Sequence, residues 1–137
     1  MQEGEPFIYD LLILLFSFSH LNLHFFRLFA AGVLKCPSHV QLYQAWACLE
    51  MRAENIERAK ILISEALTRD KSHGSSWLIA AKIEEKLGNR GLVGLILRRG
   101  LECSPYDPEL YRVSAEFEAK GGLFHKVRVD SFSVIRY

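Results

Sequence analysis

The fold of this chain follows from the stretch Ser38-His39-Val40-Gln41-Leu42-Tyr43-Gln44-Ala45-Trp46-Ala47-Cys48-Leu49-Glu50, because it recurs 34 residues later as Ser72-His73-Gly74-Ser75-Ser76-Trp77-Leu78-Ile79-Ala80-Ala81-Lys82-Ile83-Glu84. A third, more divergent copy ends at Glu118. The columns shared by all three copies are an aromatic ring (Tyr43, Trp77, Tyr111), an alanine (Ala47, Ala81, Ala115), an apolar residue (Leu49, Ile83, Phe117) and a glutamate (Glu50, Glu84, Glu118). The chain therefore contains an internal sequence repeat.

The second half of each repeat keeps the same spacing. Its columns hold an apolar residue (Phe29, Ile63, Leu97), a small residue (Gly32, Ala66, Gly100) and a second apolar residue (Val33, Leu67, Leu101). Small residues are expected where two helices approach closely. A period of 34 residues with this pattern predicts a helix, a turn and an antiparallel helix, stacked on their neighbours. The expected fold is all-α, an α-α superhelix or solenoid of about three helix-turn-helix repeats.

Capping residues, prolines and glycines set the expected helix bounds. The predicted helices span 24–35, 38–53, 56–69, 74–87, 90–103 and 108–120. Asp107 and Pro108 are a strong start signal, a capping side chain followed by proline at the first helical position. Gly88 and Asn89 suit a left-handed turn between two helices.

We divide the chain into residues 1–24, which lack the repeat pattern, repeats at 25–122, and a degenerate or truncated repeat at 123–137. The apolar run 11–18 is too short to span a bilayer, and acidic residues precede it where a signal peptide needs positive charge. Residues 1–24 are either a degenerate first helix or sequence foreign to the repeats, such as a misassigned exon, and we favour the second. Apolar ends without caps predict self-association.

Composition excludes little and favours no enzyme. Seventeen Lys and Arg face 16 Asp and Glu, so no bulk basicity indicates nucleic acid. No motif for nucleotide binding, acyl transfer or zinc hydrolysis occurs, and we expect no catalysis, cofactor or metal. Cys36, Cys48 and Cys103 are an odd set at wide spacing, which favours reduced thiols in an intracellular or organellar compartment.

The glutamate column is not expected to be catalytic. Equivalent positions in adjacent repeats are separated by roughly 10 Å per helix, which is too far for two carboxylates to act together. We interpret these glutamates as hydrogen-bond or ion-pair partners between neighbouring helices.

A column of cations also follows the period. Arg52, Lys86 and Lys120 are spaced by 34, and Lys82 and Arg112 are expected on the same face. Such a column could follow a phosphate backbone, each contact adding salt-dependent affinity. The alternative is a solvated face whose charge is offset by glutamates such as Glu85 and Glu116. Arg98 and Arg99 are expected on the opposite, convex side.

The pattern Tyr43-x-x-Trp46-Ala47-x-x-Glu50, followed by Ala59 and Ala66, resembles the half-a-TPR (HAT) repeat of RNA-processing proteins, a relative of the tetratricopeptide repeat (TPR). More narrowly, 71–77 and 91–105 are similar to the C-terminal repeats of plant chloroplast psbB mRNA maturation factors of the high chlorophyll fluorescence type. The resemblance covers about residues 25–122.

The resemblance implies binding of single-stranded RNA in mRNA processing, stabilisation and translation, with a chloroplast location and a nuclear one as the alternative. The expected RNA-binding residues are Arg52, Lys82, Lys86, Arg112 and Lys120. The expected packing residues are Tyr43, Trp46, Ala47, Trp77, Ala81, Tyr111 and Ala115. The competing interpretation is a protein-interaction scaffold of the TPR type that holds a partner peptide or helix.

Overall fold

The computed structural model describes residues 23–121, and all regular structure in that range is helical. The boundary between two compact units falls between His39 and Val40, inside the span that we assigned to the repeats. Each unit is described separately below. The predicted all-α class is confirmed for the described residues, whereas our expectations for the structure of residues 1–22 and 122–137 lie outside them.

The first unit contributes one described helix, α2 (Leu23–Lys35). Its bounds agree with the helix predicted at 24–35. Phe26 and Val33 are buried, and the apolar side chains of Phe25, Leu28 and Leu34 are more than half exposed.

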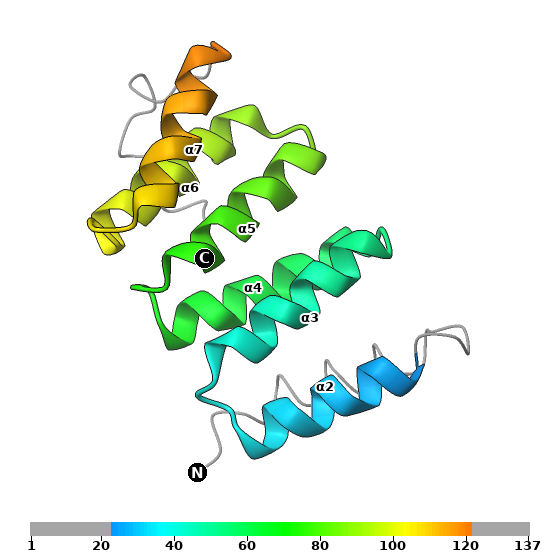
Figure 1. Ribbon diagram of the computed structural model, residues 1–137. Coiled ribbons are helices and arrows are strands. Elements are labelled where there is room, and N and C mark those ends of the chain that lie inside the picture. The colour runs from blue at the N-terminus through cyan, green and yellow to red at the C-terminus, as the bar shows by residue number, and fades with distance from the viewer. Residues whose placement is uncertain (1–22, 122–137) are drawn as a thin grey trace. The chain divides into compact units, whose positions relative to one another are not determined.

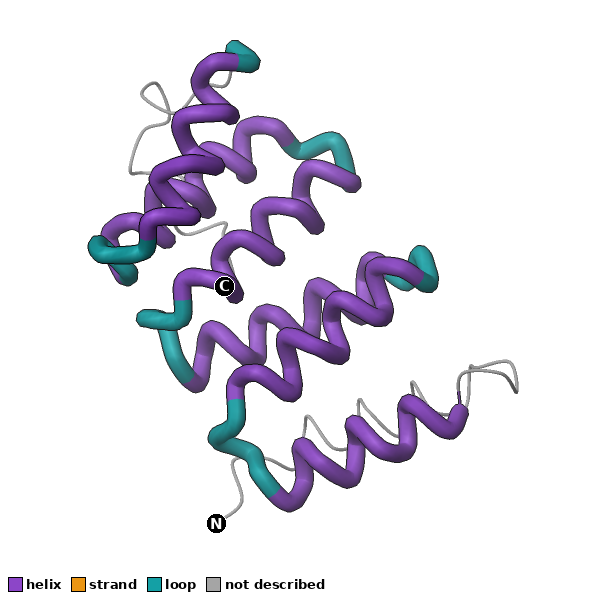
Figure 2. Tube along the Cα trace, viewed as in Figure 1, coloured by secondary structure: helices purple, strands orange, loops and turns teal. Residues whose placement is uncertain are grey.

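The second unit contains five helices, α3 (Val40–Arg52), α4 (Ile56–Arg69), α5 (Gly74–Lys86), α6 (Arg90–Cys103) and α7 (Pro108–Ala119). Each helix packs on the next one in the chain, and α5 also contacts both α3 and α7. The turns alternate between two sides of the unit, so successive helices run antiparallel (Figures 1 and 2). The predicted bounds agree with these helices to within two residues.

Local chemistry explains several of these bounds. The carboxylate of Asp107 accepts hydrogen bonds from the backbone N–H of Glu109 at 2.9 Å and of Leu110 at 3.4 Å, and Pro108 opens α7. Gly88 ends the α5 turn at φ +78°, a left-handed conformation that glycine adopts without steric cost. The equivalent residue of the preceding repeat is Glu54, which adopts φ +60° although it carries a side chain.

The repeat columns form the core of the second unit. Tyr43, Trp46, Ala47, Trp77 and Ala81 are buried, as predicted, and the second-half columns contribute buried Ile63, Ala66, Leu67, Leu97 and Gly100. Fully burying one large apolar side chain contributes about 1.5–3 kcal/mol. These columns therefore supply a large share of the stability of the unit.

The third copy of the column differs. Tyr111 is 53% exposed, with its hydroxyl donating to the carbonyl oxygen of Pro105, and Ala115 is exposed. By the 34-residue period, the helix that would pack on them falls within 123–137, outside the described residues. Self-association through this end of the unit stays a prediction.

Two glutamates of the column, Glu50 and Glu84, are buried and bond to residues of neighbouring helices and turns, which confirms the predicted structural role for these two. The Glu50 carboxylate accepts from the Trp46 indole at 3.1 Å and from the Asn55 amide at 3.0 Å. Glu84 is fully buried, accepts from the Asn89 amide at 2.7 Å, and pairs with the Lys60 ammonium on α4 at 2.5 Å.

The asparagines in these contacts occupy N-cap positions, but their side chains do not bond to the N–H groups of the helices that follow. Asn55 and Asn89 precede α4 and α6, yet neither side chain bonds to its own helix. Each side-chain amide instead donates to the glutamate in the last turn of the preceding helix. The backbone N–H groups of Asn55 and Asn89 also donate to the carbonyls of the same two glutamates at 2.9 Å. One glutamate–asparagine pair thus stabilises the turn between α3 and α4, and another stabilises the turn between α5 and α6.

Gly100 lies where α6 closely approaches α5 and α7, and it allows a matched test. A Cβ atom built there would lie 2.9 Å from Trp77 Cβ and 3.1 Å from Leu110 Cδ2, whereas a Cβ at Gly91 on the same helix meets nothing within 4 Å. Alanine is the better helix former by up to about 1 kcal/mol, but overpacking costs about 1–3 kcal/mol. We expect Gly91→Ala to raise the midpoint of urea unfolding and Gly100→Ala to lower it. Equal shifts in the same direction would contradict the packing described.

Candidate nucleic-acid interface

Three exposed cations mark the C-terminal ends of alternate helices. Arg52 is the last residue of α3, Lys86 is the last residue of α5, and Lys120 directly follows α7. All three are exposed. The ends of α3, α5 and α7 all point away from the side that carries the turns at 70–73 and 104–107 (Figure 2). The predicted column is therefore a surface feature along one side of the second unit.

The three cations differ in their partners. The Lys86 ammonium lies 3.3 Å from the Glu54 carboxylate, an exposed ion pair. Such pairs contribute little to stability and exchange readily with solvent or ligand. Within residues 23–121, the side chains of Arg52 and Lys120 make neither an ion pair nor a hydrogen bond. A position at a helix C-terminus also favours a cation electrostatically, so the column has a structural explanation as well as a functional one.

A groove of about 180 Å³ lies between α5 and α7, with α6 beneath it. Its apolar lining is buried or half-buried and consists of Leu78, Ala81, Val93, Leu97, Val113 and Phe117. Its charged lining is exposed and consists of Lys82, Glu85, Arg112, Glu116 and Lys120. The structure therefore brings three of the five predicted RNA-binding residues, Lys82, Arg112 and Lys120, to one groove.

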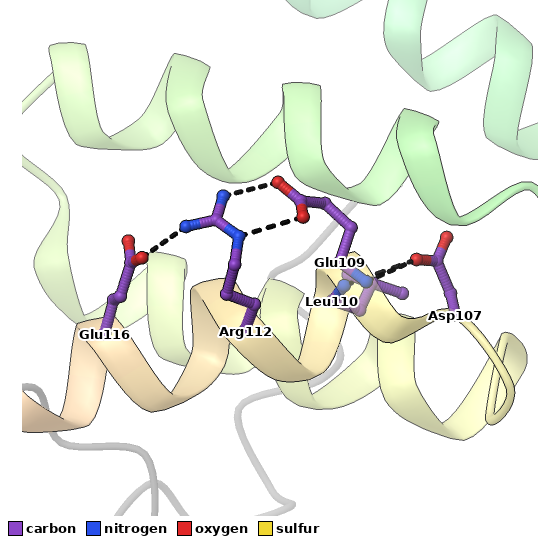
Figure 3. A network of polar contacts seen from close by, with 5 residues as sticks. All are labelled: Asp107, Glu109, Leu110, Arg112 and Glu116. Carbon is purple, nitrogen blue, oxygen red and sulfur yellow. Dashed lines mark hydrogen bonds and ion pairs between the residues drawn. The ribbon is translucent and has the colours of Figure 1, made fainter.

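Arg112 is held by two carboxylates of its own helix (Figure 3). Its Nε donates to Glu109 at 2.9 Å, its Nη2 donates to the other oxygen of Glu109, and its Nη1 donates to Glu116. The guanidinium thus lies between residues three positions before it and four positions after it, the spacing at which helix side chains meet.

The charges of this network perturb each other. The hydrogen bond with Arg112 lowers the pKa of Glu109, and nearby Lys82 adds to that lowering. The hydrogen bond with Glu109 in turn raises the pKa of Arg112. A phosphate that bound Arg112 would compete with these carboxylates, so Lys82 and Lys120 are the more available cations of the groove.

Arg90 is a further cation beside the groove, and the 34-residue period does not indicate it. Its guanidinium carbon lies 5.9 Å from the centroid of the Phe117 ring, and its Nη2 donates to the carbonyl oxygen of Lys120 at 2.9 Å. The equivalent position one repeat earlier is Ile56, so no column of like residues marks it. A cation near this ring places charge and an aromatic face together.

Two other features bear on the function. The three cysteines are free, and the described residues contain no group of three or more His, Cys, Asp or Glu that could hold a metal ion. Across residues 23–121, each helix is too short or too polar to cross a membrane.

Comparisons with known proteins do not assign the chain to a family. No protein-family model matches the chain, and no curated protein matches it either.

Proposed function

We propose that the chain is a HAT-type helical-repeat protein that binds single-stranded RNA and has no catalytic activity of its own. The fold part of this proposal is an α-α superhelix of the TPR and HAT kind. Its support is the 34-residue period, which relates α3 to α5 and α5 to α7, together with the contacts of α5 with both of its counterparts.

The observation that carries the RNA-binding proposal is the placing of one exposed cation at the end of each of these three helices, on one side of the unit. Proteins that bind single strands combine a cationic track for the phosphates with apolar or aromatic surfaces for the bases. Arg52, Lys86 and Lys120 supply the track. The groove between α5 and α7 supplies an apolar surface beside it.

The resemblance to chloroplast mRNA maturation factors supports the biological part of the proposal. A repeat protein that covers a messenger would stabilise it and aid its processing and translation through binding alone. We accordingly place the protein in the chloroplast, with the nucleus as the alternative for a HAT protein of pre-mRNA processing.

Salt-dependent binding tests the proposal. Each phosphate neutralised on a single strand contributes about 0.7 to the slope of log affinity against log salt concentration. Three contacts predict a slope of about −2 for a fluorescently labelled RNA oligonucleotide titrated with the protein at several salt concentrations. An absence of binding at low salt, or an affinity that does not change with salt, would contradict RNA binding through these cations.

A second candidate is a protein-interaction scaffold, and the mixed charge of the groove favours it. Lys82 and Glu85 on α5 face Arg112 and Glu116 on α7 across an apolar lining, an arrangement that also suits a peptide carrying both signs of charge. Peptide capture through an apolar groove predicts a shallow salt dependence. If the labelled RNA did not bind the protein in the titration described above, this candidate would be favoured.

A further inference from the structure

We propose that the groove between α5 and α7 holds one unstacked base of the bound RNA, and that Glu85 selects guanine there. This inference rests on the proposed function, since it names the part of an RNA that enters this groove. It assigns a ligand class and a specificity-determining residue to a cavity lined by three neighbouring helices.

The size of the groove sets the first limit. Pockets for drug-sized ligands occupy about 300–1,000 Å³, and this groove occupies about 180 Å³. One planar ring system fits such a volume, whereas a helix or a run of several side chains does not. The charged residues of its lining are exposed to solvent, which allows the sugar and phosphates to stay outside.

The lining suits the face of a base. Leu78 and Val113 are half-buried apolar side chains on opposite helices, and Phe117 adds an aromatic ring that can stack on any base. The ammonium groups of Lys82 and Lys120 stand on α5 and just beyond α7, where they can meet the phosphates on the two sides of that nucleotide.

Glu85 carries the selectivity. Within the described residues its carboxylate makes neither an ion pair nor a hydrogen bond, although it lines the groove. Glu116, the other carboxylate of the lining, is already bonded to Arg112 (Figure 3). An ionised carboxylate only accepts hydrogen bonds, so it favours the base edge with the most adjacent donors.

Guanine presents that edge. Its ring N–H and amino group point the same way and can donate to both oxygens of one carboxylate. Cytosine and adenine offer an amino group beside an acceptor nitrogen, and uracil offers one N–H between two carbonyl acceptors. The order of preference at this position should therefore place guanine first and uracil last.

Competition among short RNAs tests the inference. The probes are an oligouridine and three versions of it that carry a single guanosine, adenosine or cytidine, each measured against the whole chain at one low salt concentration. A bidentate contact to a base edge is worth about 1–3 kcal/mol of discrimination, and for this exposed carboxylate we expect the lower end, about fivefold tighter binding of the guanosine probe than of oligouridine.

Two variants separate base selection from charge. Glu85→Gln should reduce the guanosine-to-uridine ratio to about one, because the amide presents a donor and an acceptor in place of two acceptors. Glu102→Gln removes the same charge from α6, where Glu102 pairs with Arg99 at 3.1 Å, and it should leave the ratio unchanged. Val113→Phe, which fills the groove with a larger side chain at a half-buried position of its lining, should also abolish the ratio while circular dichroism shows an intact fold.

The outcomes are distinguishable. Equal binding of all four probes by the wild type, or a guanosine preference that survives either Glu85→Gln or Val113→Phe, would overturn the inference while RNA binding stands. Failure of every probe to bind would remove the proposed function itself.

Discussion

Trp77→Ala is expected to lower the free energy of unfolding by about 3–5 kcal/mol, the usual cost of removing a buried tryptophan. The Trp77 side chain is 1% exposed and lies against Gly100, where α6 closely approaches α5. Its indole N–H donates to the Lys71 carbonyl oxygen at 2.7 Å. Its removal would open a cavity where α5, α6 and α7 meet. Single domains are stable by only about 5–15 kcal/mol, so this one change removes a large fraction of the total.

Urea denaturation followed by circular dichroism measures this effect. The matched control is Tyr106→Ala, which removes an aromatic side chain that is 95% exposed and should change the stability by no more than about 0.5 kcal/mol. If the two variants unfolded at the same urea concentration, Trp77 would not occupy the buried position described.

Lys60→Met should be the second most damaging change, and it should cost more than Glu84→Gln. Both residues belong to one ion pair at 2.5 Å, but the Glu84 side chain is fully buried whereas that of Lys60 is 36% exposed. Breaking a fully buried pair costs about 3–5 kcal/mol because one charge loses its counter-ion. We expect about 2–3 kcal/mol for Lys60→Met, because Lys60 is partly exposed.

Glu84→Gln should cost about 1 kcal/mol, since the Lys60 ammonium can turn to solvent and the glutamine oxygen can still accept from Asn89. The double variant should be about as stable as Glu84→Gln alone, because the neutral glutamine does not need a cation. Unfolding measurements on the four proteins form a double-mutant cycle. Additive effects of the two single changes would show that the pair does not couple α4 to α5.

The sequence predicted the helices well because their signals are local. Asp107 and Pro108 start α7 through one side chain and one ring, and Gly88 supplies a left-handed conformation, so neither depends on distant contacts. The buried columns of the first two copies were also predictable, because a repeated aromatic or alanine at a fixed period meets an equivalent neighbour wherever the adjoining helices are present; Tyr111 and Ala115 of the third copy are exposed. The glutamate column followed from the same logic.

Side-chain pairing was less accessible. Asn55 and Asn89 share the 34-residue spacing, but asparagine before a helix is compatible with a turn, a cap or a side-chain partner, so the spacing alone does not indicate the bond to glutamate. The engagement of Arg112 by Glu109 and Glu116 depends on rotamers that no pattern fixes. The groove itself depends on the distance between α5 and α7.

We propose that Arg52, Lys86 and Lys120 contact RNA phosphates, and the salt dependence of RNA binding by a triple glutamine variant is the test of that proposal. Glutamine keeps a polar side chain with a similar helix propensity, so circular dichroism should match the wild type. The control replaces Arg98, Arg99 and Lys71, cations away from the groove, with glutamine. We predict that the triple variant flattens the slope of log affinity against log salt by about 2 units, at about 0.7 per phosphate, and that the control changes it much less. Equal slopes for the two triple variants would contradict the claim.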